Sequence, residues 1–219
     1  MPADPNLRLE RSMFRGGVET IIACDEVGRG ALAGPVAVGM VVVDRTLKPM
    51  PKGLRDSKLL PEPHREALAP KCSAWVLHSA VGLASADEID SLGISRCLGL
   101  AGRRALELLE QQGADVGTST LILDGNWDYL NPALDARLEV VTRIKADRDC
   151  ASVAAASVIA KVHRDHLLIE RDAVTPGYGW PSNKGYASRA HFEAIDLLGP
   201  SDYHRLTWLK GDIALEQPA

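Results

Sequence analysis

Four acidic residues follow apolar, β-branched runs in this chain, and together they could hold metal ions. They are Asp25, Glu26, Asp124 and Asp147. A buried strand carries acids at its end to the rim of its sheet. Clustered carboxylates repel one another unless cations lie between them, and oxygen ligands without nearby His or Cys favour Mg²⁺ or Mn²⁺ over zinc. Any one acid could instead cap a turn or pair with an arginine, but the repeated pattern favours a metal site.

A glycine-rich segment follows the first acid pair. Residues 28–33 (GRGALA) fit the loose dinucleotide pattern G-x-G-x-x-[GA], which requires a helix to follow and point its N-terminus at a pyrophosphate. Here Gly34-Pro35 leads instead into the strand-like run VAVGMVVV. The pattern therefore argues against a nucleotide-cofactor enzyme, and glycines at this place can let backbone groups approach a ligand.

The apolar periodicity predicts the elements that must position these groups. Strands are expected at 20–24, 35–43, 75–84, 120–124 and 138–144, and helices at 86–112, 151–172 and near 188–198. A strand-rich first half followed by strand–helix alternation predicts an α/β fold with a mixed sheet covered by helices. A right-handed crossover would bring the fourth strand beside the first. Small residues at 154–157 would let their helix pack closely on the sheet.

The chain is long enough for one core, and no linker divides it. Residues 1–17 are polar and without periodicity, so we expect a flexible N-terminal tail followed by a single domain over 18–219. Residues 48–71 are expected to form a Pro- and charge-rich link.

Composition narrows the class of protein further. The chain has 46% hydrophobic and 25% charged residues, without an apolar run long enough to cross a membrane or a secretory signal. Its four cysteines lie far apart, which argues against a zinc site and a disulfide framework and predicts a cytoplasmic protein. A net charge of −4 means that any contact with nucleic acid depends on local groups and bound cations.

The ordered motifs of the chain resemble the ribonuclease HII family from about residue 20 to residue 208. The matching segments are 25–36 (DEVGRGALAGPV), 56–58 (DSK), 65–66 (RE), 87–90 (DEID), 123–126 (LDGN), 145–147 (KAD), 154–165 (AAASVIAKVHRD) and 184–186 (KGY). The chain departs from the family pattern at Ala31, Ala146, Asn183, Ala187-Ser188 and 206–208, none of which is a proposed metal ligand.

The resemblance implies an RNase H-like fold, with a mixed five-stranded sheet flanked by helices and a helical C-terminal part. It implies two ions, Mg²⁺ or Mn²⁺, on Asp25, Glu26, Asp124 and Asp147. It also implies that the backbone of Gly28, Arg29 and Gly30 reads a ribose 2′-OH, with Tyr186 stacking on the next deoxyribose. From residue type we add Ser57, Lys58 and Lys184 as candidate phosphate contacts.

The implied activity is cleavage on the 5′ side of ribonucleotides, leaving 3′-OH and 5′-phosphate ends. The expected substrates are RNA/DNA hybrids and single ribonucleotides embedded in duplex DNA, and the expected state is a monomer active in ribonucleotide removal. A ribonuclease HIII would need an extra N-terminal domain, for which residues 1–17 leave no room. A type 1 ribonuclease H would lack the Gly-Arg-Gly and Lys-Gly-Tyr motifs, and a non-catalytic nucleic-acid-binding relative would have lost one or more acids.

Overall fold

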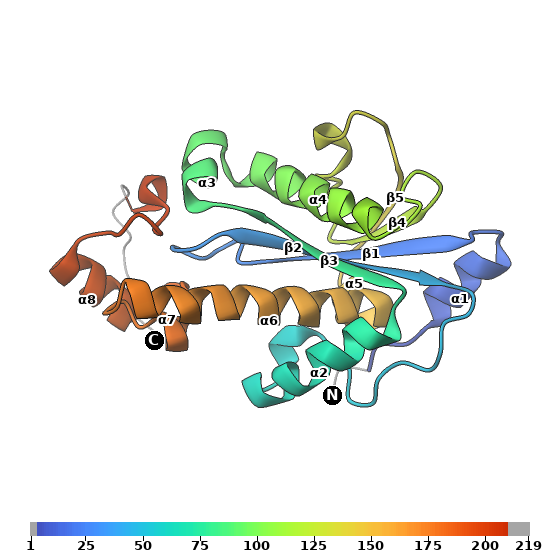
Figure 1. The fold of residues 1–219 in the computed structure, drawn as a ribbon, viewed down its shortest axis with the longest axis horizontal. Coiled ribbons are helices and arrows are strands. Elements are labelled where there is room, and N and C mark those ends of the chain that lie inside the picture. Colours follow the sequence, from blue (N-terminus) through green and yellow to red (C-terminus); the bar gives the residue numbers. More distant parts are fainter. Residues whose placement is uncertain (1–3, 210–219) are drawn as a thin grey trace.

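A computed structural model describes residues 4–209, which form a five-stranded sheet covered by helices (Figure 1). The strands are β1 (Thr20–Val27), β2 (Val36–Asp44), β3 (His78–Ala84), β4 (Thr120–Asp124) and β5 (Glu139–Arg143). The α-helices are α1 (Arg8–Arg15), α2 (Glu62–Trp75), α3 (Ala86–Leu92), α4 (Ile94–Gln111), α5 (Ala146–Asp149), α6 (Ala151–Val174), α7 (Trp180–Asn183) and α8 (Arg189–Leu198). Short 3₁₀ helices are η1 (Ser57–Leu59), η2 (Asn131–Ala133) and η3 (Leu206–Trp208).

The sheet is mixed, as the alternation of elements predicts. Its strand order is β3-β2-β1-β4-β5. The pairs β1–β2 and β2–β3 are antiparallel, whereas β1–β4 and β4–β5 are parallel. The fourth strand therefore lies beside the first, which confirms the expected placement and brings the carboxyl ends of β1 and β4 to one edge.

Helices cover the two faces of the sheet, with α4 on one and α6 on the other (Figure 1). Because side chains alternate along a strand, Ile22 and Cys24 of β1 pack into the core beneath α4. Ile21 and Ala23 pack on the α6 side. A Cβ at Gly39 of β2 would lie 2.6 Å from the carbonyl oxygen of Ala156, so the small residues of α6 do pack closely on the sheet.

The helix predicted over 86–112 is interrupted once. Gly93 adopts φ 80°, a left-handed conformation that glycine tolerates, and it separates α3 from α4. The side chains of Ser85 and Glu88 form a capping box at the start of α3. The apolar period continues across the break, which is why the sequence alone indicates one helix.

The expected flexible tail over residues 1–17 is wrong where the structure describes it. The helix α1 occupies this segment, and Glu10 on it is fully buried. The Glu10 carboxylate accepts hydrogen bonds from the backbone N–H and hydroxyl of Ser152, at 3.0 and 2.7 Å. Tertiary contact thus orders a segment whose own composition is polar. Residues 1–3 lie outside the described part.

The link expected at 48–71 contains most of α2, which was missed because prolines and charges obscure its periodicity. Pro63 lies in its first turn, where a missing N–H costs nothing, and Pro70 lies inside the helix. The helix packs against α6 through Leu68 and Cys72. Among residues 4–209, no helix has the length and apolar character needed to cross a bilayer.

Candidate active site

The four predicted acids lie at neighbouring element ends. Cys24 of β1 pairs with Leu123 of β4 in parallel register, so Asp25 and Asp124 are the next residues on adjacent strands. The backbone N–H of Ala146 donates to Asp124 Oδ1 at 2.6 Å, which ties the start of α5 to the end of β4. Asp147 follows on α5 and is 4% exposed. Strand register and one backbone hydrogen bond therefore bring the acids from three elements together.

Burial and mutual repulsion raise the pKa values of three of these carboxyl groups. Burial raises the pKa of Asp25 well above its usual value, and the charges of Glu26 and Asp124 add to it, while the Ser157 hydroxyl acts in the opposite direction. Burial and then Asp124 raise the pKa of Glu26. Burial, Asp124 and Asp56 raise the pKa of Asp147 to about 6. The site concentrates negative charge that lacks full compensation.

Two cations lie beside this cluster: Arg29, whose guanidinium is 3.7 Å from Glu26 Oε1, and Lys58. The Lys58 Nζ lies 3.7 Å from Asp147 Oδ2. Burial acts to lower the pKa of Lys58, but the surrounding carboxylates, Asp25 foremost, raise it overall. The side chain is 65% exposed, so its ammonium can reach a ligand in solution. Its contact with a phosphate stays a prediction.

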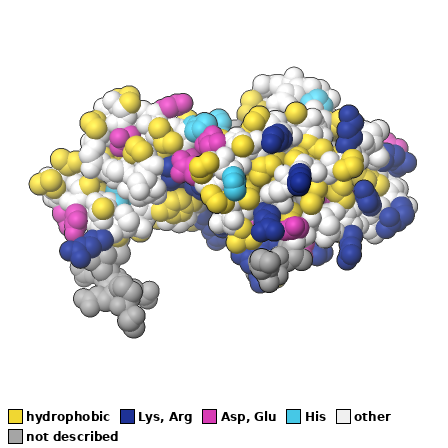
Figure 2. Space-filling model, turned by 90° about the horizontal axis from the view of Figure 1, so that it is seen from below, with side chains coloured by type: hydrophobic (Ala, Val, Ile, Leu, Met, Phe, Trp, Pro, Cys, Tyr) yellow, Lys and Arg dark blue, Asp and Glu magenta, His cyan; other side chains and the backbone are white. Residues whose placement is uncertain are grey.

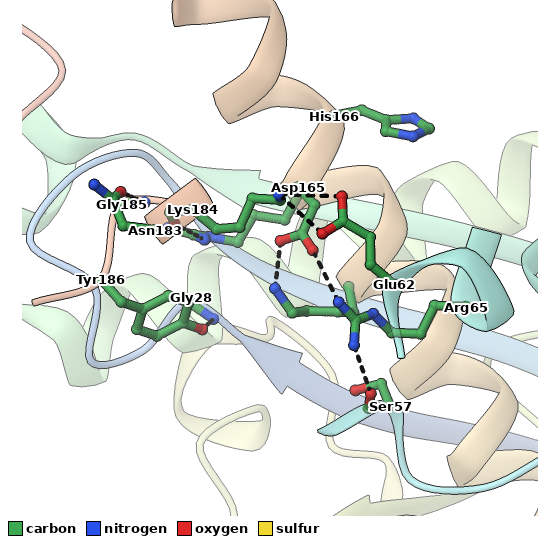
Figure 3. Close-up of polar contacts among 12 residues, drawn as sticks. Gly28, Ser57, Glu62, Arg65, Asp165, His166, Asn183, Lys184, Gly185 and Tyr186 are labelled. Carbon is green, nitrogen blue, oxygen red and sulfur yellow. Dashed lines mark hydrogen bonds and ion pairs between the residues drawn. The ribbon is translucent and has the colours of Figure 1, made fainter. Parts of the chain in front are cut away.

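The segment that carries Lys58 is held from both sides. The Ser57 hydroxyl lies 2.9 Å from that of Ser157 on α6, in the buried part of the site. Arg65 of α2 donates to the Ser57 carbonyl at 3.2 Å and pairs with Asp165 of α6 at 3.7 Å (Figure 3). Asp56 accepts from the backbone N–H of Lys58 at 2.9 Å. Ser57 is therefore buried, and the structure gives its hydroxyl a protein partner.

The glycine loop and the Lys-Gly-Tyr loop meet at the same edge. Tyr186 Oη accepts a hydrogen bond from the backbone N–H of Gly28 at 3.1 Å, and Figure 3 shows the ring directed at this loop. Gly28 has φ 81°, and a Cβ there would lie 2.0 Å from Arg164 Nε. Arg29 and Gly30 are exposed. Gly28 is thus required by both conformation and space.

Two fully buried arginines hold these loops. Arg164 of α6 donates to the carbonyls of Pro35, Ala33 and Lys184 at 2.8 to 2.9 Å. Arg205 donates to the carbonyls of Gly28, Arg29 and Gly34 at 2.7 to 3.2 Å. A guanidinium can serve several carbonyls at once because it has five N–H donors in one plane.

Lys184, a predicted phosphate contact, is buried and forms an ion pair. Its side chain is 6% exposed, and its Nζ lies 3.1 Å from Glu62 Oε1. Contact with a phosphate would require that pair to open. On the neighbouring helix face, His166 Nε2 lies 3.0 Å from Glu66 Oε1, so this histidine pairs with α2.

Several positioning residues were missed from the sequence. Arg205, Arg65 and Asp56 have charged side chains that looked like ordinary surface groups, although Arg205 and Asp56 are buried. The usable signal was their place inside family-like motifs. Sequence cannot distinguish a buried, carbonyl-binding arginine from a solvated one, because the distinction depends on distant backbone.

The four acids offer the type of ligand atom that divalent cations such as Mg²⁺ prefer. These atoms are carboxylate oxygens under mutual repulsion, which is the environment that hard cations relieve. Within residues 4–209, no three Asp, Glu, His or Cys side chains already form an ion-binding group. Asp124 and Asp147 are instead engaged by the Ala146 N–H and by Lys58. Binding an ion would require these carboxylates to reorient.

A mixed sheet with acids at the ends of β1 and β4 is the architecture of RNase H-like endonucleases. The family model for Ribonuclease HII matches residues 22–210, and the chain belongs to this family. It is an RNase H type 2 endoribonuclease that acts on RNA/DNA hybrids.

Relatives named Ribonuclease HII cover nearly the whole chain. The protein from Streptomyces avermitilis is 44% identical over 210 residues, covering 95% of this chain and 85% of that protein. The protein from Caulobacter vibrioides is 41% identical over 219 residues, with 100% and 97% coverage. The ribonuclease H2 of Pyrococcus horikoshii OT3 superposes with a TM-score of 0.61 at 25% identity, covering 86% and 93%. Bst-RNase HIII in complex with Mn²⁺, at 23% identity and a TM-score of 0.65, supports the fold alone.

Proposed function

We propose that this enzyme cuts the phosphodiester on the 5′ side of ribonucleotides, leaving 3′-OH and 5′-phosphate ends. The substrates are RNA/DNA hybrids and single ribonucleotides embedded in duplex DNA. Asp25, Glu26, Asp124 and Asp147 would hold two divalent cations, Mg²⁺ or Mn²⁺. The observation that carries the proposal is the register of Cys24 with Leu123, which supports a joint role for Asp25 and Asp124.

The protein's own groups have separable tasks in this scheme. Divalent cations bound among carboxylates activate water and neutralise charge on a reacting phosphate. The four acids would place and orient that chemistry, and Lys58 would contact a phosphate next to it. The backbone of residues 28–30, held by Arg205, would contact the 2′-OH, which is the group that separates RNA from DNA at one position. The Tyr186 ring would pack on the neighbouring deoxyribose.

An acidic protein needs local positive groups to approach nucleic acid. Figure 2 views the molecule from the α2 and α6 side. Lys and Arg side chains lie among hydrophobic ones over the half that carries α2, with fewer toward α8. This distribution supports a local electrostatic contact in spite of the net charge of −4.

The test uses a labelled DNA duplex containing one ribonucleotide, an all-DNA control, and Mg²⁺ or Mn²⁺. We expect one cut on the 5′ side of the ribonucleotide, none in EDTA, and none from Asp124→Asn, whose folding is verified by circular dichroism. Near-normal cutting by Asp124→Asn would refute the ligand assignment. The absence of cutting by folded wild type with either ion would refute the activity.

We further propose that the enzyme acts as a monomer in the cytoplasm and takes part in removing ribonucleotides from DNA. Sedimentation at micromolar concentration tests the first part, since a stable dimer would contradict it. Complementation of a host lacking its own type 2 ribonuclease H tests the biological role. Failure of the expressed protein to reduce genomic ribonucleotide content would argue against that role.

A further inference from the structure

A groove of about 350 Å³ lies between α4 and the segment that joins β4 to β5. Its walls include Arg96, Gly99, Trp127, Tyr129, Pro132 and Ala133. In Figure 1 the β4–β5 connection arches over α4, and η2 packs on that helix. Gly99 makes this close approach feasible, because a Cβ there would lie 2.7 Å from the Tyr129 carbonyl oxygen.

The groove is connected to the strand end that carries Asp25 through Tyr129, which is part of its wall. Trp127 follows Asp124 by three residues, and its ring centroid lies 6.1 Å from that of Tyr129. Tyr129 Oη lies 3.6 Å from the Sγ of Cys24, the residue directly before Asp25. The groove therefore lies on the α4 side of the strand end that carries Asp25.

The charged lining of this groove is a single arginine, whereas four other surface cavities combine cationic and carboxylate side chains. Arg96 is exposed and is the charged residue of this lining, and it forms no ion pair within residues 4–209. Four other cavities each include at least one carboxylate, from Glu107, Asp149, Asp44 or Asp128. An unpaired guanidinium in an acid-free groove suits an anionic ligand.

The exposed aromatic ring narrows the chemistry of that ligand. Trp127 is 46% exposed, although burying such a ring is favourable. An aromatic face beside a free arginine matches a nucleotide strand, which offers flat sugar or base faces and regularly spaced phosphates.

We propose that this groove binds the sugar–phosphate backbone of the substrate duplex next to the cut site, with the phosphate on Arg96 and the sugar against Trp127. The inference rests on the proposed function, because it assumes that a duplex occupies the acids. It adds a contact on the α4 side of the sheet, away from the glycine loop and Tyr186.

The experiment measures binding of a fluorescent duplex containing one ribonucleotide, in EDTA, over a range of NaCl concentrations. The logarithm of the association constant falls linearly with the logarithm of the salt concentration. Losing one phosphate contact makes this slope less steep by about 0.9. We expect this change for Arg96→Ala and its reversal in Arg96→Lys. Trp127→Ala is expected to weaken Kd about ten-fold, and Trp127→Phe less. Arg103→Ala is the matched control on the same helix, since Arg103 pairs with Glu107 at 2.9 Å.

Cleavage by the wild type is assayed in parallel, so the two proposals can fail separately. Wild-type salt slope and Kd in both Arg96→Ala and Trp127→Ala would overturn the groove assignment, whether or not the enzyme cuts. An equal decrease in salt slope for Arg103→Ala would also overturn it, because the decrease would then reflect the loss of any positive charge on α4. A changed slope confined to Arg96→Ala, in an enzyme that does not cut, would sustain the groove and refute the proposed activity.

Discussion

Tyr186 Oη accepts a hydrogen bond from the backbone N–H of Gly28 at 3.1 Å, across 158 residues of sequence. The contact joins the two loops to which sequence resemblance assigns ribose and deoxyribose recognition. It also engages the Gly28 N–H, so a ribose hydroxyl that used this donor would have to displace or share the phenol. The geometry therefore couples the tyrosine to the glycine loop in the free protein.

Two substitutions of Tyr186 should distinguish the contribution of its ring to activity from that of its hydroxyl. We expect Tyr186→Ala to lose activity on a single embedded ribonucleotide by on the order of 10²-fold, because it removes both the packing surface and the loop contact. Tyr186→Phe should retain more, since the ring remains. Single-turnover rates on that duplex measure both, and unchanged cutting by Tyr186→Ala would contradict the assigned role.

Arg205 should matter for stability as well as for the loop. It is fully buried and satisfies the carbonyls of Gly28, Arg29 and Gly34. Arg205→Met leaves these acceptors without their donor, so we expect a loss of roughly 3 kcal/mol in unfolding free energy. Urea denaturation measures it. The exposed Arg189→Met, which breaks only a surface pair with Glu193, should leave the unfolding free energy nearly unchanged.

Neutralising Asp147 should stabilise the metal-free protein while removing activity. Its folded-state pKa of about 6 lies above the ordinary aspartate value of 3.8, so folding disfavours the charged form. That penalty grows as pH rises through this interval and is complete above about pH 6. Asp147→Asn should therefore gain on the order of 2 kcal/mol at pH 7.5 in EDTA, measured by urea unfolding. Asp149→Asn, which loses an exposed pair with Arg143, should show no gain.

A pair of buried histidines should make stability fall at acidic pH. The Ser201 N–H donates to His204 Nδ1 at 3.0 Å, so His204 carries its proton on Nε2 and directs it at His191 Nε2, 3.1 Å away. His191 Nδ1 then donates to the Tyr186 carbonyl at 2.9 Å. Both rings are neutral in this arrangement.

Burial, with a smaller effect of His191, lowers the pKa of His204 from 6.5 to about 4. The unfolded chain takes up this proton below pH 6.5 and the folded protein does so only near pH 4. Stability is therefore complete above pH 6.5 and is lost progressively toward pH 4, by on the order of 3 kcal/mol. Urea unfolding from pH 7 to 4.5 measures it. His204→Gln should flatten the dependence, whereas the exposed His64→Gln should not.

Glu10 should anchor α1 to the beginning of α6. Its Oε1 accepts both hydrogen bonds from Ser152 in a fully buried setting. Glu10→Ala should cost about 2 kcal/mol, because it removes a helix cap and leaves buried donors unpaired. Glu10→Gln retains the accepting oxygen and should cost less. Chemical denaturation measures both, with the exposed Glu19→Ala as control; equal stability of Glu10→Ala and wild type would contradict the anchoring role.

Local pattern was enough to predict the five strands, their mixed arrangement and the acids at their ends. The β-branched runs before Asp25 and Asp124 are signals within a few residues, and they do not depend on distant contacts. The same local signals led to errors in two segments whose structure depends on tertiary contacts. The polar segment around Glu10 is a docked helix, and prolines obscured α2.

Tertiary structure alone decided which charged side chains serve as framework and which remain available. Lys58 lies exposed beside the acids, whereas Lys184 is buried against Glu62, although both are lysines in family-like motifs. Arg164 and Arg205 bind carbonyls far away in the chain, and Arg96 remains free beside Trp127. The physical reason is that a charged group's state depends on desolvation and on its partners, which the fold supplies from distant segments. Residue type and spacing determine what chemistry is available, and the fold determines where it can occur.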